Sequence, residues 1–253
     1  HIAEIPLENV RVAFADSLSG YSSTRITIGA VRTEAYGLTK RSSAITLVPA
    51  IDSIDFGKNV RIRQFHFAIA KDTLCSPSGE ANSILQNVNV YALKNELDST
   101  YIYTNSLKDS DFVGMKRISK GVPVYNGKDS LSFDFTEEFA MEYIKATREE
   151  LDSIPLFTKR FPGIYLCVDE PIANGGRINM FQLKTSYTDT YYLSGNYAEL
   201  KITSDYGDRK DVDTTFYFFY GSQSFDNQPD QYALNVTSHE TQCFLTDNAG
   251  EYI

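Results

Sequence analysis

Apolar and polar side chains alternate along much of this chain, and the pattern is clearest over residues 60–69. In that segment His66 falls on one face, whereas Phe65 and Phe67 fall on the other. A period of two residues is typical of a strand in a half-buried antiparallel sheet. The pattern therefore predicts a protein built mainly from β-strands.

Eleven segments have this character, and turn residues such as Asn174-Gly175-Gly176 separate them. The predicted strands cover residues 10–14, 25–31, 43–50, 60–70, 84–93, 130–135, 163–169, 177–185, 198–204, 212–220 and 232–238. Many short strands with turns between them are typical of sandwiches and jelly rolls. We predict an all-β fold, an antiparallel β-sandwich with a jelly-roll-like arrangement.

One helix interrupts the series, over about residues 137–151. Thr136 is placed to act as its N-cap, and Glu137 and Glu138 meet the positive end of the helix dipole. A stripe at helical spacing is made by Phe139, Tyr143, Ile144, Thr147 and Leu151. We expect this stripe to cover an open end or edge of the sandwich, and contact with a partner protein is the alternative.

The length of 253 residues allows one large all-β domain or two modest ones. The least regular stretch, residues 100–126, predicts a long excursion between two strands. The strands after it have no obvious partners other than the strands before it. We therefore expect residues 1–253 to form a single β-sandwich domain.

Charge and cysteine usage exclude several classes of function. The net charge of −9 would repel phosphate backbones, so we expect no nucleic-acid partner. No apolar run reaches the length of about 18 to 20 residues that a membrane helix needs. Cys75, Cys167 and Cys243 lie far apart without a C-x-x-C pair, which indicates neither a zinc site nor a dense disulfide framework. Cys167, inside an apolar run, is expected to be a small core residue.

A tyrosine-rich segment is the first candidate binding site. It contains Tyr187, Tyr191, Tyr192 and Tyr197 among hydroxyl and amide side chains. Flat rings beside polar groups suit sugars, because sugar C–H groups stack on the ring and polar groups bind the hydroxyls. The alternative is a hairpin whose rings pack on the sheet, and the absence of Trp favours that alternative.

An acidic cluster is the candidate metal site. Asp205, Asp208, Asp211 and Asp213 lie around a turn between two strands. Closely spaced oxygens on a loop can bind calcium, although this spacing differs from an EF-hand. Neighbouring Arg209 and Lys210 favour the alternative of a solvated hairpin. No cofactor other than structural calcium is expected.

No residue pattern announces catalysis. His66 is isolated from other metal-binding residue types and is expected to be an ordinary sheet histidine, and no Gly-x-Ser-x-Gly elbow is present. Glu199 and the pair Asp169-Glu170 supply carboxylates for glycoside hydrolysis, but every acidic protein offers such pairs. We therefore predict no catalytic residues and no enzymatic activity.

Three short stretches, in this order along the chain, carry a family resemblance. They are Ile28-Gly29-Ala30 with Tyr36-Gly37-Leu38-Thr39, then Val88-Asn89-Val90-Tyr91-Ala92-Leu93, then Phe161-Pro162-Gly163-Ile164-Tyr165-Leu166. Together they resemble a lipoprotein family of Bacteroidetes bacteria, the domain-of-unknown-function family numbered 4270, over about residues 16–239. The chain departs from the family pattern at Glu34-Ala35, where an Asp-Pro is expected, and it has no lipid-bearing N-terminal cysteine.

The resemblance implies an exported outer-membrane lipoprotein, at the cell surface or in the periplasm, with a carbohydrate-binding-like sandwich. It also implies that the chain is a fragment of a longer lipoprotein whose only membrane contact is an N-terminal lipid anchor. We therefore expect a non-catalytic module that binds a glycan or an envelope protein. The alternatives are an assembly protein that pairs through strand edges and a jelly-roll glycoside hydrolase.

Overall fold

The computed structural model of the chain describes residues 25–34, 37–51, 53–72, 84–97, 113–128, 130–182 and 196–220. For five further strands it describes the backbone alone: β1 (Arg11–Ala13), β12 (Thr185–Tyr187), β13 (Leu193–Gly195), β16 (Ala233–His239) and β17 (Phe244–Thr246). Four of these strands form two separate two-stranded sheets, β1 with β17 and β12 with β13.

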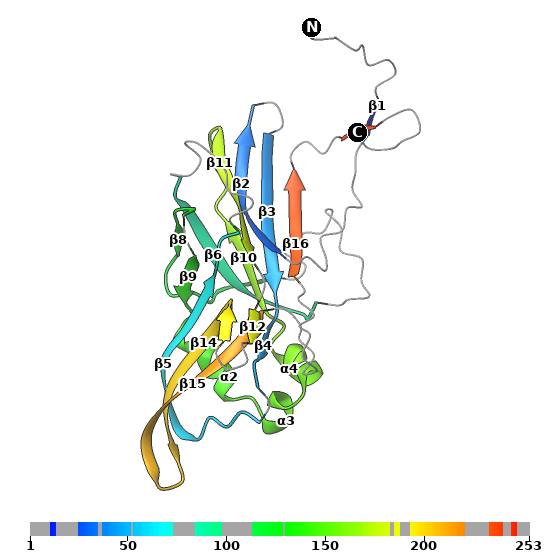
Figure 1. Cartoon of the computed structure of the whole chain (residues 1–253). Coiled ribbons are helices and arrows are strands. Elements are labelled where there is room, and N and C mark those ends of the chain that lie inside the picture. The colour runs from blue at the N-terminus through cyan, green and yellow to red at the C-terminus, as the bar shows by residue number, and fades with distance from the viewer. Residues whose placement is uncertain are drawn as a thin grey trace.

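The larger sheet has eight strands, and its main path runs in the order β11-β2-β3-β10-β6-β7 (Figure 1). Its strands are β2 (Arg25–Thr33), β3 (Gly37–Ile45), β6 (Gln86–Leu93), β7 (Val113–Arg117), β8 (Val124–Tyr125), β10 (Ile164–Val168) and β11 (Gly175–Gln182), joined by β16. β16 pairs with β3, and β8 pairs with β6. Every pair in the sheet is antiparallel.

The smaller sheet has five strands in the order β4-β15-β14-β5-β9, also antiparallel throughout. Its strands are β4 (Leu47–Pro49), β5 (Lys58–Ile69), β9 (Leu131–Asp134), β14 (Tyr197–Tyr206) and β15 (Arg209–Tyr220). The predicted all-β antiparallel sandwich is confirmed.

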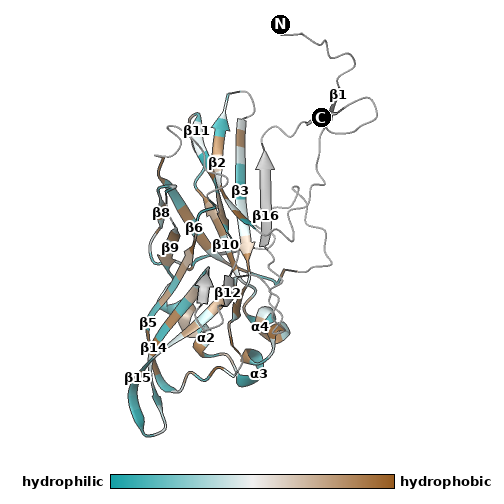
Figure 2. Cartoon of the chain, in the orientation of Figure 1, coloured by the Kyte–Doolittle hydropathy of each residue, from teal (hydrophilic) through white to brown (hydrophobic). Residues whose placement is uncertain are grey.

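The hydrophobic core contains residues from both sheets, as the alternation along the strands requires. Val90 and Leu166 of the larger sheet and Phe67 and Leu200 of the smaller sheet have no exposed surface and belong to one apolar cluster. Figure 2 shows the hydrophobic colours in strands such as β6 and β10, and the hydrophilic colour at the tip of the β14–β15 hairpin. The continuous apolar run of β10 is buried at every position.

The two sheets are joined directly at two places. At Thr46 the chain passes from β3 in the larger sheet to β4 in the smaller one. On another side, residues 118–120 bond to both sheets: Ile118 N–H donates to Val90 O at 3.0 Å, and Lys120 N–H donates to Asp134 O at 2.8 Å. These residues therefore cover the outer edge of β9.

The single helix predicted over 137–151 is wrong, because the segment forms two short helices. They are α2 (Glu137–Ile144) and α3 (Arg148–Leu151), and a third helix that was not predicted, α4 (Ile154–Arg160), follows. Thr147 ends the first helix region by capping the second: its side chain accepts from Glu150 N at 3.2 Å, and Glu150 accepts from Thr147 N at 2.7 Å. This reciprocal capping box is readable in the sequence as Thr-x-x-Glu.

The first part of the helix prediction is confirmed. The Thr136 hydroxyl accepts a hydrogen bond from Phe139 N at 3.2 Å, as an N-cap should. Phe139 and Tyr143 point into the core and contact Phe65, with ring centroids 6.0 and 5.2 Å away. α2, which carries these two residues, lies in the lower half of the molecule in Figure 1.

Residues 100–126 are more regular than predicted, because β7 and β8 lie within them and pair with β6. Residues 98–112 lie outside the described residues. None of the helices in the described ranges is both long enough and apolar enough to span a membrane.

Candidate functional site

A β-bulge in β5 decides which side chains face outward from the smaller sheet. Gln64 pairs with Lys201 but Ile62 pairs with Ile202, so Arg63 is an extra residue between them. Strict alternation would place Arg61 and Arg63 on the buried face of Phe65. The bulge instead turns Ile62 toward the core and leaves both arginines exposed.

A transverse row of four polar side chains crosses the outer face of this sheet. Glu199 on β14 lies opposite Tyr217 on β15 and opposite His66 on β5, and His66 lies opposite Asp134 on β9. Adjacent strands are about 4.8 Å apart, so the row spans about 14 Å. We call Tyr217, Glu199, His66 and Asp134 the outer row.

Hydrogen bonds fix one end of the outer row. His66 Nδ1 lies 2.7 Å from Asp134 Oδ1, which also accepts a bond from Gln64 Nε2 at 2.9 Å. Because a carboxylate only accepts, Nδ1 carries the proton, and Nε2 is the ring nitrogen left for a ligand. His66 is therefore oriented by its neighbours, although the sequence indicated only an ordinary sheet histidine.

A pocket of about 230 Å³ adjoins the outer row. Its polar lining includes His66, Glu199, Tyr197, Asn196 and Ser130. Asn196 is buried and held by the backbone, since its side chain accepts from Ala70 N at 2.8 Å and donates to Gln182 O. The pocket thus has one rigid wall and one wall of half-exposed side chains.

Two tyrosine rings flank Glu199. The rings of Tyr197 and Tyr217 lie 5.3 Å apart and are nearly perpendicular, at 88°. Burial, and then the negative charge of Glu199, raise the pKa of Tyr197 above its usual value. Oε2 of Glu199 lies 3.0 Å from Lys201 Nζ. Glu199 therefore lies beside two aromatic rings and one ammonium group, partly shielded from water.

Of the four tyrosines predicted to bind a ligand, one is seen to contribute its side chain to this site. Tyr197 lines the pocket, whereas Tyr191 and Tyr192 lie outside the described residues and Tyr187 is described by its backbone alone. Nothing in the sequence pattern distinguishes Tyr217 or Asp134 from other polar strand residues. Alternation alone shows that both face outward, but only the strand register brings them into one row.

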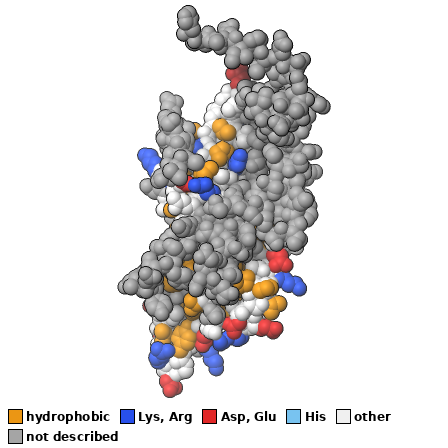
Figure 3. Space-filling view, turned by 45° about the vertical axis from the view of Figure 1, so that its right-hand side comes forward, with side chains coloured by type: hydrophobic (Ala, Val, Ile, Leu, Met, Phe, Trp, Pro, Cys, Tyr) orange, Lys and Arg blue, Asp and Glu red, His pale blue; other side chains and the backbone are white. Residues whose placement is uncertain are grey.

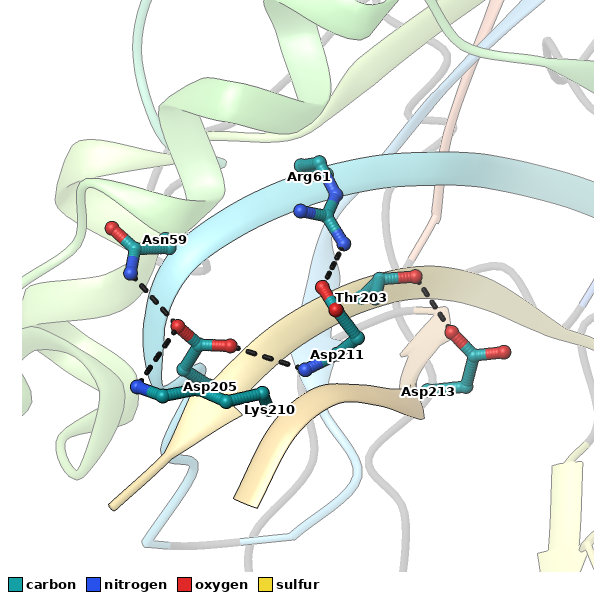
Figure 4. A network of polar contacts seen from close by, with 7 residues as sticks. All are labelled: Asn59, Arg61, Thr203, Asp205, Lys210, Asp211 and Asp213. Atoms are coloured by element: carbon teal, nitrogen blue, oxygen red, sulfur yellow. Dashed lines mark hydrogen bonds and ion pairs between the residues drawn. The ribbon is translucent and has the colours of Figure 1, made fainter. Parts of the chain in front are cut away.

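The acidic residues do not converge as calcium ligands. Asp205 accepts from Asn59 Nδ2 at 2.8 Å, from Asp211 N at 3.1 Å and from Lys210 Nζ at 3.3 Å (Figure 4). These hydrogen bonds, that of Asn59 foremost, lower the pKa of Asp205. Asp208 lies in the adjoining turn and is not part of the network.

Arginines neutralise the other two carboxylates. Asp211 pairs with Arg61, and Asp213 lies 2.9 Å from Arg63 and accepts from Thr203 at 2.6 Å. Within the described residues, no group of three or more His, Cys, Asp or Glu side chains could hold a metal ion. The prediction of a calcium site at Asp205, Asp208, Asp211 and Asp213 is therefore corrected to a hairpin linked to β5 by ion pairs.

Calcium should leave the thermal unfolding midpoint unchanged relative to a chelator at the same ionic strength. A ligand that binds only the folded state raises the midpoint, and here the protein itself occupies the carboxylates. Differential scanning calorimetry with calcium, with magnesium and with chelator measures this. A midpoint that rises with calcium alone would restore the metal site.

A larger groove of about 950 Å³ lies between α2 and the segment after β7. Its charges are largely paired across the groove or along the helix, as in Lys116 with Glu138 and Lys145 with Glu142. In the space-filling view, charges of both signs are mixed at the lower end of the described surface (Figure 3).

The cysteines add no chemistry to the site. Cys167 is buried, which confirms its expected place in the core, and Cys75 and Cys243 lie outside the described residues. Comparison with protein-family models, with curated proteins and with solved structures finds no match for this chain.

Proposed function

We propose that this chain is a non-catalytic glycan-binding module whose ligand lies across the outer face of the smaller sheet. The observation that carries the proposal is the outer row itself. Its four side chains follow one another across four strands and lie beside a pocket. A row about 14 Å long matches an extended oligosaccharide better than a single small molecule.

The chemistry of the row suits sugar hydroxyl groups. The Glu199 carboxylate accepts hydrogen bonds and Nε2 of His66 can form a further one, while the tyrosine rings offer apolar surface for sugar C–H groups. The bonds that hold His66 and Asn196 reduce the entropy lost on binding, because these groups are already oriented. This combination of aromatic surface and fixed polar groups is typical of ligand sites.

Glycoside hydrolysis receives less support. Glu199 and Asp134 do share one face, two strand spacings or about 10 Å apart, near the upper end of what such enzymes use. However, Asp134 accepts from both His66 and Gln64, and Glu199 pairs with Lys201. Neither carboxyl is left over to donate a proton to a leaving group.

Pairing through strand edges receives less support at β9 and at β11. The outer edge of β9 is bonded by residues 118–120, and β11 is bonded by residues 70–72 through Asp72 N to Met180 O at 2.9 Å. Covered edges leave little backbone for a partner strand. If the ligand is an envelope protein instead of a glycan, we propose that it binds the same outer row.

The family resemblance extends the proposal to a location. An outer-membrane lipoprotein of a Bacteroidetes bacterium, anchored by an N-terminal lipid and displayed at the cell surface or in the periplasm, would meet glycans there. The acidic chain, with a net charge of −9, fits a ligand other than nucleic acid.

Removing a ring from the outer row should weaken glycan binding. Tyr217→Ala is expected to weaken binding by at least about tenfold, because it removes a ring face worth about 1.5 kcal/mol or more. Glycan arrays identify the ligand, and isothermal titration calorimetry measures the dissociation constants of wild type and variant.

Tyr206→Ala is the matched control, since it removes the same side chain at the far tip of the β14–β15 hairpin. Its affinity should equal that of the wild type. Equal affinities for all three proteins, or no glycan bound by the wild type, would refute the proposed site. A single stoichiometric protein captured from outer-membrane extracts through Tyr217 would shift the proposal to a protein partner.

A further inference from the structure

We infer that the glycan carries an amino group and that Glu199 receives it as an ammonium ion. This inference deepens the proposed function and rests on it. It concerns the class of sugar that the pocket selects, namely amino sugars with an unacetylated amine.

Glu199 is the carboxylate that lines the pocket, and Asp134 is a second carboxylate of the outer row on the other side of His66. Lys201, which lies 3.0 Å from Glu199, offsets one of these two negative charges. An anionic sugar such as a uronic acid would bring a third carboxylate to this surface, where like charges repel. A protonated amine would instead be attracted to these carboxylates.

Glu199 already holds one ammonium group and has room for another. Its Oε2 pairs with Lys201 Nζ at 3.0 Å, and within the described part of the chain its Oε1 has no donor. Lys201 lies two residues along the same face of β14. The Lys201 side chain therefore shows one position from which an ammonium group can pair with the Glu199 carboxylate.

The two tyrosines complete an environment for a cation. Their nearly perpendicular rings lie 5.3 Å apart beside Glu199, so that ring surface and carboxylate are offered together. Cations bind favourably over the face of a Tyr ring, and the attraction grows as water is excluded. The raised pKa of Tyr197 reflects both the burial and the negative charge.

An acetylated amino sugar is the natural comparison, because it keeps the backbone and hydroxyl groups but loses the positive charge. A charge-assisted hydrogen bond is about twice as strong as a neutral one. We therefore expect glucosamine oligosaccharides to bind about tenfold more tightly than N-acetylglucosamine oligosaccharides of equal length.

Titration calorimetry with this matched pair tests the inference, at a mildly acidic pH where the amines are protonated. Glu199→Gln keeps the shape of the side chain but removes its charge. It should reduce the preference for the amine to about twofold or less, while binding of the acetylated form is retained. Equal affinity of the wild type for both forms, or a preference for the acetylated form, would overturn the inference.

Lys201→Gln should have the opposite effect, because it removes the internal ammonium group that competes for Glu199. Amino-sugar binding is expected to strengthen about threefold. Lys210→Gln, which removes a lysine paired with Asp205 at the hairpin tip, is the control and should change nothing. A loss of amino-sugar affinity in Lys201→Gln would count against the inference.

The two proposals fail in different ways. If the acetylated oligosaccharide or another neutral glycan binds through Tyr217 without any preference for the amine, only the inference falls. If no glycan of any charge binds the wild type, the proposed function falls as well.

Discussion

Phe65→Ala should lower the free energy of unfolding by about 3–5 kcal/mol, close to the whole stability of many domains. Phe65 is 1% exposed and contacts rings from three other parts of the fold: Phe135 after β9, Tyr143 of α2 and Phe218 of β15. Truncation would leave a cavity where the helix meets the sheet. Urea denaturation followed by circular dichroism measures the change.

Phe65→Leu is the control for this prediction, because it keeps an apolar side chain and most of the volume. It should cost about half as much or less. A loss below about 1 kcal/mol for Phe65→Ala would mean that the aromatic cluster is not what fixes α2 to the smaller sheet.

Gly29→Ala should destabilise the larger sheet by about 3 kcal/mol. A Cβ at Gly29 would lie 2.2 Å from Arg177 O and 2.6 Å from Ile178 Cα, both backbone atoms of β11. These atoms cannot move without separating β2 from β11, which are paired along their whole length. Thermal and chemical unfolding of the variant measure the loss.

Gly207→Ala provides the matched glycine control. Gly207 has a φ of +60° in the β14–β15 turn, and nothing lies within 4 Å of an added Cβ. It should cost only the strain of that conformation, about 1 to 2 kcal/mol. Equal losses at the two positions would show that contact with β11 is not what requires Gly29.

Local patterns predicted most of the strands. Alternation identified the central strands, and the expectation that Val88 to Leu93 forms a core strand is confirmed, with Val88 and Val90 at 1% and 0% exposed. Two glycines of the stretches that carry the family resemblance have structural roles. Gly29 lies against another backbone, and Gly37 has a φ of +65°.

Local patterns gave wrong predictions where hydrogen-bond partners determined the structure. Residues 37–42 carry several polar side chains and were not predicted as strand, yet they form the first part of β3 because β2 and β16 pair with it. Thr147 fits the helical stripe by spacing but acts as a helix cap. In both cases hydrogen-bond partners, rather than periodicity, decided the structure.

The candidate site was less predictable than the fold. Its outer row combines residues 66, 134, 199 and 217, and the bulge at Arg63 restores the outward direction of the β5 arginines. Registers between strands separated by 60 or more residues are set by turns and bulges that a single sequence does not display. For the acidic cluster, closeness in sequence predicted a shared metal site, but the carboxylates do not converge on one point in the structure.

The chain crosses between sheets at Thr46, and residues 118–120 bond to both layers. Separating the two layers would break the hydrogen bonds of residues 118–120 to one layer or the other, and the chain at Thr46 would still tie β3 to β4. Slow amide protons in β3 and β5 should therefore exchange with a common opening free energy. A glycan that braces the outer row would then slow exchange even in the distant layer that it never touches.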